Sequence, residues 1–142
     1  MKDVTKLNRR QQILTVLASE LEKNHGLPIT TSSLAHAVGV SEAALYRHFA
    51  SKAKMFEALI NFAEESIFGL VNKILAQESN PITRCEKIIQ LVLTFAEKNP
   101  GITRILISDV LIGENEQLHA RISLFFDRIE TQIRQILREA NL

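Results

Sequence analysis

Apolar residues recur three or four positions apart along most of the chain, which is the spacing of amphipathic helices. The first such run predicts a helix over about residues 8–24. Its apolar face consists of Ile13, Leu14, Leu17 and Leu21. The stretch "NHGLP" follows, and we expect Gly26 to cap this helix while Pro28 prevents its continuation.

Two short helices are predicted next, over about residues 31–38 and 42–48, and a long helix over about 52–77. The long helix carries an inward-facing stripe that consists of Phe56, Leu59, Ile60, Ala63, Ile67, Leu70, Val71 and Ile74. Gly69 interrupts this helix at a cost of about 1 kcal/mol relative to alanine, so we expect close packing there.

The C-terminal half of the chain continues in helices. Residues 82–98 are apolar nearly all round, which predicts a buried helix. "NPG" at 99–101 predicts a stop, followed by helices over about 102–111 and from about 114 onward. The last helix has a stripe that consists of Leu118, Ile122, Phe125, Ile129, Ile133 and Leu137. Because no stretch alternates as strands do, the predicted fold class is all-α.

The composition of the 142-residue chain, 46% hydrophobic and 23% charged, is that of a folded protein. The first residues, "MKDVTKLNRRQQ", have no apolar core, so no signal peptide is expected, and no apolar run reaches membrane-spanning length. The single cysteine, Cys85, excludes an internal disulfide. We expect a cytoplasmic protein with domains over residues 1–51 and 52–142.

The net charge of +1 hides an asymmetry along the chain. Residues 1–54 carry eight basic and four acidic side chains, whereas the remainder carries nine basic and twelve acidic ones. A basic front end on an acidic body suggests that the front end meets a polyanion.

Residues 31–49, "TSSLAHAVGVSEAALYRHF", have the layout of a helix-turn-helix. Gly39 can take the left-handed conformation that such a turn needs, and Val40 can fill the corner. Ser41 is the expected N-cap of the second helix, with Glu42 at its positive end.

The second helix has two different sides when its residues are placed at about 100° intervals. Leu45 and Phe49 fall together and face inward. The outward side carries Ala43, Ala44, Arg47, Tyr46 and His48. Small residues let a helix approach the floor of a DNA major groove, where an arginine can bond guanine or a phosphate.

This outward side could also be ordinary solvated surface. The combination of a glycine turn, an N-cap and a basic rim in the same third of the chain favours DNA binding. The residues expected to reach DNA are Arg9, Arg10, Thr30, Thr31, Ala43, Ala44, Tyr46, Arg47, His48 and Lys52. Lys52 and the free N–H groups of its helix would bind a phosphate.

An enzyme is not predicted. The four histidines have no metal-ligand spacing with one another or with Cys85, and they are His25, His36, His48 and His119. The chain has neither a glycine-rich phosphate loop nor a nucleophile elbow. We therefore expect no catalytic residues, no metal and no cofactor.

The stretch "ITTSSLAHAVGVSEAALYRHFASKAKMFEALI" resembles the N-terminal domain of TetR-type regulators and matches their "LA…GVS…LYxHFxxK…L" pattern. Two later stretches, "EKNPGITRIL" at 97–106 and "RIETQIRQILRE" at 128–139, are similar to the nucleoid occlusion factors within that family. The resemblance covers most of the chain.

The resemblance implies a TetR-like fold, with a three-helix DNA-binding domain followed by a helical body. It implies a homodimer on a palindromic site in double-stranded DNA, associated with the nucleoid. It assigns DNA contacts to Thr30, Thr31, Ser41, Ala43, Ala44, Tyr46, Arg47, His48 and Lys52.

The resemblance further implies that the protein binds the cell-division GTPase FtsZ and antagonises its assembly over the chromosome. The family's partner groove lies between the long helix and the next one, which makes Phe62, Leu91 and Asn99 candidates. Phe62 and Leu91 could equally be core residues.

Two alternatives stay open. Family members continue for two helices that form the dimer interface, whereas this sequence ends at Leu142, so we expect either a fragment or dimerisation through other surfaces. TetR-type bodies commonly hold a small-molecule pocket, so the alternative function is a repressor that a ligand releases from DNA. The mostly aliphatic body without tryptophan favours a filled core or a protein-binding surface.

Overall fold

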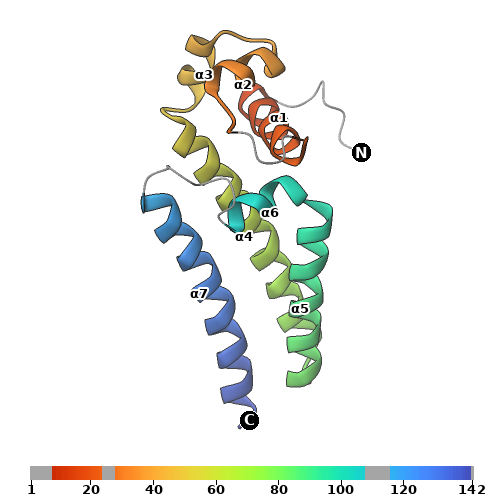
Figure 1. Cartoon of the computed structure of the whole chain (residues 1–142). Coiled ribbons are helices and arrows are strands. Elements are labelled where there is room, and N and C mark those ends of the chain that lie inside the picture. The colour runs from red at the N-terminus through yellow and green to blue at the C-terminus, as the bar shows by residue number, and fades with distance from the viewer. Residues whose placement is uncertain (1–7, 24–27, 108–115, 142) are drawn as a thin grey trace.

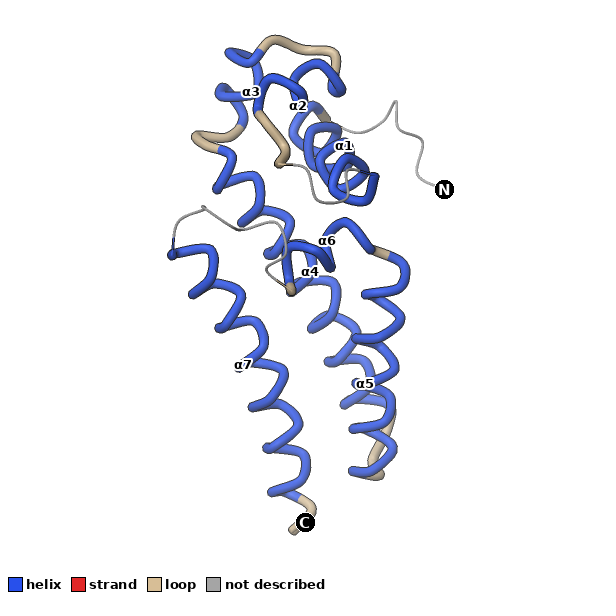
Figure 2. Tube along the Cα trace, in the orientation of Figure 1, coloured by secondary structure: helices blue, strands red, loops and turns tan. Residues whose placement is uncertain are grey.

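The computed structural model describes residues 8–23, 28–107 and 116–141, and every regular element within these ranges is an α-helix (Figure 2). The helices are α1 (Arg9–Lys23), α2 (Thr31–Val38), α3 (Glu42–His48), α4 (Lys52–Gln77), α5 (Pro81–Lys98), α6 (Pro100–Leu106) and α7 (Glu116–Glu139). The all-α prediction is confirmed, and the predicted bounds of α1 to α5 agree to within one residue. Gly26, the expected cap of α1, lies outside the described residues.

Helices α1, α2 and α3 form a cluster around the start of α4, at the top of Figure 1. From there α4 runs into the body, where α5 and α7 lie along it. The short helix α6 packs against α1 and also against α4. The cluster of α1, α2 and α3 is therefore connected to the body both by the α4 backbone and by α6.

One continuous core of apolar side chains includes residues from all seven described helices. Within the described residues, no polar or charged side chain is buried. The largest contribution comes from α4, with Met55, Phe56, Leu59, Ile60, Ala63, Ile67, Phe68 and Val71. Because burying a large apolar side chain stabilises a fold by about 1.5–3 kcal/mol, α4 is the central element of the protein.

The predicted stop is confirmed for α5, which ends at Lys98, but α6 begins at Pro100 and not at about residue 102. Asn99 is at once the C-cap of α5 and the N-cap of α6, and Pro100 begins α6. Proline suits the first position of a helix, where its missing N–H would have no intrahelical partner. Helix α6 then ends at Leu106, short of the predicted end, and residues 108–111 of that prediction lie outside the described ones.

The predicted burial of α5 is also wrong. Within α5, which is described in full, Ile88 is the only buried residue, and Leu91 and Phe95 are half-buried against the core. Its exposed apolar residues are Ile82, Ile89 and Leu93. An apolar pattern shows that a helix could be buried, but not on how many sides other helices cover it.

Two expectations for α4 fail at neighbouring residues. Leu70, placed in the inward stripe, is 44% exposed, whereas Phe68 is buried beneath the guanidinium of Arg128 at 3.8 Å from its ring centroid. Phe68 and Leu70 lie about 200° apart around the helix, and α7 covers the Phe68 side. Gly69 is not a site of close packing, because a Cβ there would have no atom within 4 Å.

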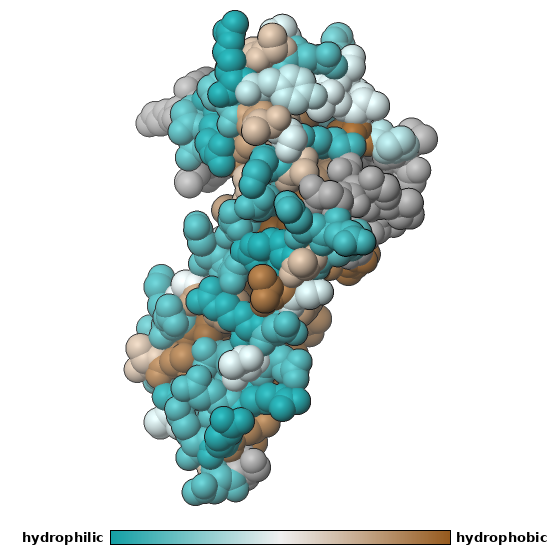
Figure 3. Space-filling view, turned by 90° about the vertical axis from the view of Figure 1, so that its left-hand side faces the viewer, coloured by the Kyte–Doolittle hydropathy of each residue, from teal (hydrophilic) through white to brown (hydrophobic). Residues whose placement is uncertain are grey.

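The stripe of α7 is confirmed at Leu118, Ile122 and Phe125, but it continues to Ile136 rather than Leu137. Ile136 follows Leu118 by 18 residues, which is five full turns at about 3.6 residues per turn, so both residues face the core. Residues 114 and 115 of the predicted start lie outside the described ones. The face shown in Figure 3 is mainly hydrophilic, with separate hydrophobic patches.

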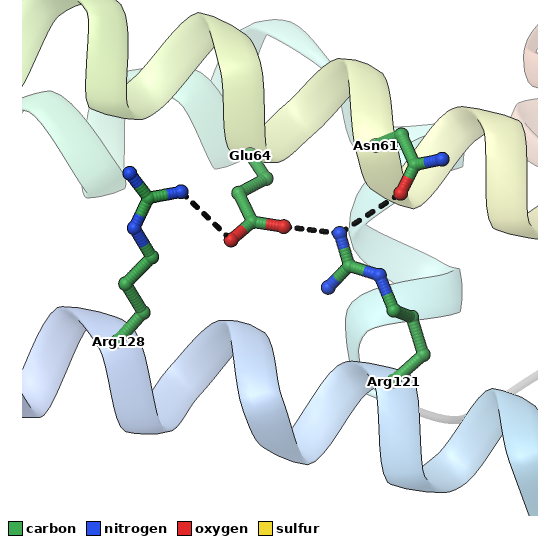
Figure 4. A network of polar contacts seen from close by, with 4 residues as sticks. All are labelled: Asn61, Glu64, Arg121 and Arg128. Carbon is green, nitrogen blue, oxygen red and sulfur yellow. Dashed lines mark hydrogen bonds and ion pairs between the residues drawn. The ribbon is translucent and has the colours of Figure 1, made fainter.

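A charged cluster fixes α7 to α4. Glu64 of α4 lies between two arginines of α7 and accepts hydrogen bonds from Arg121 and from Arg128, the latter at 2.9 Å (Figure 4). Arg121 also donates to Asn61 at 2.9 Å. Burial raises the pKa of the Glu64 carboxyl, but the hydrogen bonds and charges of Arg128 and Arg121 outweigh this and hold that pKa below its usual range.

Candidate nucleic-acid interface

The turn between α2 and α3 has the geometry that the sequence predicts. Gly39 has a φ of 85°, in the left-handed region, and its N–H donates to the carbonyl of Ala35 at 2.9 Å. The Ser41 hydroxyl accepts a hydrogen bond from the Ala44 N–H at 3.1 Å. The second helix therefore starts at Glu42, whose carboxylate lies at the positive end of its dipole.

The two sides of α3 are separated as predicted. Leu45 and Phe49 are buried, and they attach the helix to the core. The outward residues Ala43, Tyr46, Arg47 and His48 are exposed, and Ala44 is half-buried. Arg47 makes no hydrogen bond or ion pair with another described residue. The side of α3 that faces away from the core is therefore small at its start and basic or polar at its end.

Hydroxyl groups connect the start of α2 with α3. Thr30 is the N-cap of α2 and accepts from the Ser33 N–H at 3.0 Å. The Tyr46 hydroxyl donates to the Thr31 hydroxyl at 3.4 Å, and Thr31 donates to the Glu42 carboxylate at 3.5 Å. Residues 30, 31 and 46, each predicted to contact DNA, are thus brought together at one edge of the domain.

Lys52 lies beside the same edge. It is the first residue of α4, and its ammonium donates to the carbonyl of Ile29 at 3.2 Å, just before Thr30. The ammonium is also 5.9 Å from the ring centroid of Phe56. This side chain therefore joins the beginning of α4 to the segment that leads into α2.

The two arginines at the start of α1 differ in their surroundings. Arg9 donates locally, to Gln12 of the same helix at 3.0 Å. Arg10 reaches across to α3: its guanidinium lies 4.2 Å from the ring centroid of Phe49 and donates to the carbonyl of His48 at 3.2 Å. Both arginines were predicted from the sequence to contact DNA, and the difference between them was not predicted.

Of the three partner candidates, Phe62 lies at the contact between α4 and α5, while Leu91 is on α5 and Asn99 is its C-cap. Phe62 is 50% exposed on α4, and its ring centroid is 6.5 Å from that of Phe95 on α5. Leu91 and Asn99 are half-buried and lie one turn to either side of Phe95. Phe95 was not predicted, although its spacing of four residues from both Leu91 and Asn99 could have identified it.

Two further features are absent from the part of the chain that the structure describes. No helix there is both long and apolar enough to span a membrane. Among those same residues, no three His, Cys, Asp or Glu side chains gather in an arrangement that could hold a metal ion.

Family models match both parts of the chain. Residues 15–59 match the model of bacterial regulatory proteins of the tetR family. Residues 79–142 match the SlmA-like model of the tetracyclin repressor-like C-terminal domain. The first match includes the helix-turn-helix, and the second includes α5, α6 and α7.

Solved structures share the fold. A TetR-family transcriptional regulator from Bordetella parapertussis 12822 superposes with a TM-score of 0.76 at 18% sequence identity, covering 94% of this chain and 69% of that one. The ketosteroid transcriptional regulator KstR2 of Mycobacterium tuberculosis superposes with a TM-score of 0.70 at 22% identity, covering 92% and 67%. The predicted TetR-like fold is confirmed.

Curated relatives are similar over nearly the whole chain. The nucleoid occlusion factor SlmA of Alteromonas mediterranea is 58% identical over all of this chain and 73% of its own length. That of Marinomonas sp. (strain MWYL1) is 60% identical over 96% of this chain and 70% of its own length. The chain belongs to the TetR family of DNA-binding regulators and, within it, to the SlmA family of nucleoid occlusion factors.

Proposed function

We propose that this nucleoid occlusion factor binds its DNA site by laying α3 in the major groove. The separation of α3 into a buried side and a small, basic exposed side is the observation that carries the proposal. Ala43 and Ala44 let the helix approach the groove floor and contact thymine methyl groups. Arg47 then donates to the O6 and N7 of a guanine or to a phosphate, since no described residue engages it.

Phosphates on either side of the groove are held by the edge that contains Thr30, Thr31 and Tyr46. Their hydroxyls lie at hydrogen-bonding distance from one another or from neighbouring backbone, so their positions are already fixed before DNA arrives. Ser41 and Lys52 add a helix N-terminus and a positive charge. Such contacts set the register of α3 but do not read sequence.

The second part of the proposal is that FtsZ binds along the contact between α4 and α5. Phe62 is large, apolar and half-exposed there, and its ring is tilted by 43° relative to that of Phe95. Exposed aromatic residues are typical anchors of protein interfaces. Asn99 continues the same row of α5, and its side chain donates to the Phe95 carbonyl, which supports this stretch as one surface.

In this proposal two chains bind a palindromic site, and the DNA-bound form antagonises FtsZ assembly over the chromosome. The protein then works in the cytoplasm and on the nucleoid. Half-sites one helical turn or a multiple of it apart are expected, because a two-fold dimer presents its recognition helices on one side of the duplex.

Three measurements test the proposal. Selection from random duplexes should yield a palindrome, and sedimentation velocity should show two chains on each selected duplex. Co-sedimentation of FtsZ polymers should then fall when the chain and the selected duplex are both present. Selection of no sequence would overturn the DNA part, and polymers unaffected by the complex would overturn the FtsZ part.

Phe62→Ala and Phe126→Ala form a matched pair for the second part. The two residues are 50% and 45% exposed, but Phe126 is on α7. Only Phe62→Ala should abolish the effect on FtsZ, and both variants should bind the selected duplex normally. An equal loss in both variants would place the FtsZ contact elsewhere. A small molecule that releases the wild-type chain from DNA, with no effect on FtsZ, would favour a ligand-controlled repressor.

A further inference from the structure

We infer that Arg10 is a positioning residue for DNA recognition, which holds the C-terminal end of α3 in place instead of binding a phosphate. This inference rests on the DNA binding proposed above. It divides two neighbouring arginines, both expected from the sequence to contact DNA, into different roles.

The C-terminal end of α3 needs a contact that holds it in place. This helix has only seven residues, so its direction depends on how each end is held. Its start is fixed by the Gly39 turn and the Ser41 cap. At its end the last carbonyls have no intrahelical donor, and the helix dipole is negative there.

The Arg10 guanidinium lies at that end of α3. It donates to the carbonyl of His48, the last residue of α3, at 3.2 Å. It also lies 4.2 Å from the ring centroid of Phe49, which is 3% exposed. A positive group in this place both satisfies a free carbonyl and lies over an aromatic face, and each contact stabilises the helix end.

The Arg10 contact controls the position of the side chains at the end of α3. Arg47 and His48, expected to reach the DNA, are the last two residues of α3 and immediately precede Phe49. Movement of the helix end therefore moves their side chains relative to the groove. Since Arg10 belongs to α1, it fixes this end of α3 relative to another helix of the domain.

Arg9 provides the comparison within the same helix turn. Both side chains are exposed, but Arg9 donates to Gln12 of its own helix, whereas Arg10 donates to α3. Successive residues point about 100° apart around a helix, so Arg9 cannot take the place of Arg10 on Phe49. We assign the phosphate contact to Arg9.

Salt dependence of DNA affinity separates the two roles. Arg9→Gln should weaken binding to the selected and to an unrelated duplex alike, and lower the slope of log affinity against log salt by about 0.9. Arg10→Gln should leave that slope and the unrelated duplex unchanged, but reduce affinity for the selected duplex by about tenfold, within the range of one base contact. Arg10→Lys should fall between wild type and Arg10→Gln, since it keeps the charge without the planar group.

Amide hydrogen exchange of the free chain gives a readout that does not need DNA. Arg10→Gln should speed exchange at the end of α3 several-fold, including the Phe49 N–H that donates to Leu45, and Arg9→Gln should not. If Arg10→Gln fails to fold, Arg10→Lys is measured in both assays.

A slope lowered equally by changes at Arg9 and Arg10, or unaltered exchange in the Arg10 variants, would overturn the inference. If the wild-type chain selects no sequence, the proposed DNA function fails. The exchange result would still stand or fall by itself.

Discussion

Gly101 on α6 lies so close to the backbone carbonyl of Ala18 on α1 that no side chain fits between them. A Cβ on Gly101 would overlap the Ala18 oxygen and also approach the Glu22 N–H. Backbone atoms cannot rotate away as a side chain could, so the two helices would have to separate. In the same interface Arg104 donates to the carbonyl of Leu21 near the end of α1. This is where the DNA-binding part rests against the body.

The first prediction concerns this contact. Gly101→Ala should destabilise the chain by about 1–3 kcal/mol, the usual cost of overpacking. Gly69→Ala is the matched control, because a Cβ there has open space; it should stabilise by up to about 1 kcal/mol. Urea unfolding at neutral pH measures both. A Gly101→Ala variant as stable as wild type would show that α1 and α6 can separate at little cost.

The second prediction concerns Arg47 and Lys52. Arg47→Ala should cost about 1–3 kcal/mol in discrimination between the selected and an unrelated duplex. Lys52→Ala should weaken binding to both duplexes and lower the salt slope by about 0.9. Fluorescence anisotropy titrations at several salt concentrations measure these effects. Wild-type affinity in both variants would contradict the placement of α3 in the groove.

The third prediction separates the two roles of Ser41. Ser41→Ala removes the N-cap of α3 and should cost about 1 kcal/mol of stability. Ser41→Asp keeps a capping oxygen, so thermal unfolding should stay near wild type. Its negative charge beside the phosphates should nevertheless weaken DNA binding. Wild-type affinity in Ser41→Asp would argue against a phosphate close to this residue.

The fourth prediction concerns pH. Because the arginines lower the pKa of Glu64 in the folded state, its contribution to stability is present above the ordinary glutamate value and is lost as pH falls through the lowered value. Glu64→Gln should therefore cost about 1–2 kcal/mol at neutral pH. This difference should disappear in acid, below the lowered pKa.

Glu130→Gln is the control for that pH series. Glu130 pairs with Arg134, which lies one helical turn further along the solvent side of α7. Exposed pairs of this kind contribute about 0.5 kcal/mol or less. Thermal unfolding followed from neutral to acid pH compares the two variants. A Glu64→Gln cost that stayed constant over this range would mean that packing, not charge, is responsible.

Most helices could be predicted because local chemistry determines them. Gly39, Ser41 and the prolines fix where chains turn and helices start, and these signals lie within a few residues of what they control. The buried side of α3 follows from the same short-range periodicity. Even the wrongly predicted start of α6 has a local cause, since proline both ends one helix and begins the next.

What could not be predicted depends on which helix lies next to which. The exposure of Leu70 and the burial of Phe68 follow from the side of α4 that α7 covers. The stacking of Arg10 on Phe49 joins residues 39 positions apart, and the sequence around neither residue predicts it. Charge type suggested DNA contact for both Arg9 and Arg10, but only their neighbours in space separate them.

The length of α4 has a mechanical consequence. With 26 residues it is about 39 Å long, and three residues separate its start from the end of α3. A rotation of about 5° at its first turn would move its last turn by about 3 Å if it stays straight. A small movement at the α3 end of this helix would therefore become a larger movement at its other end.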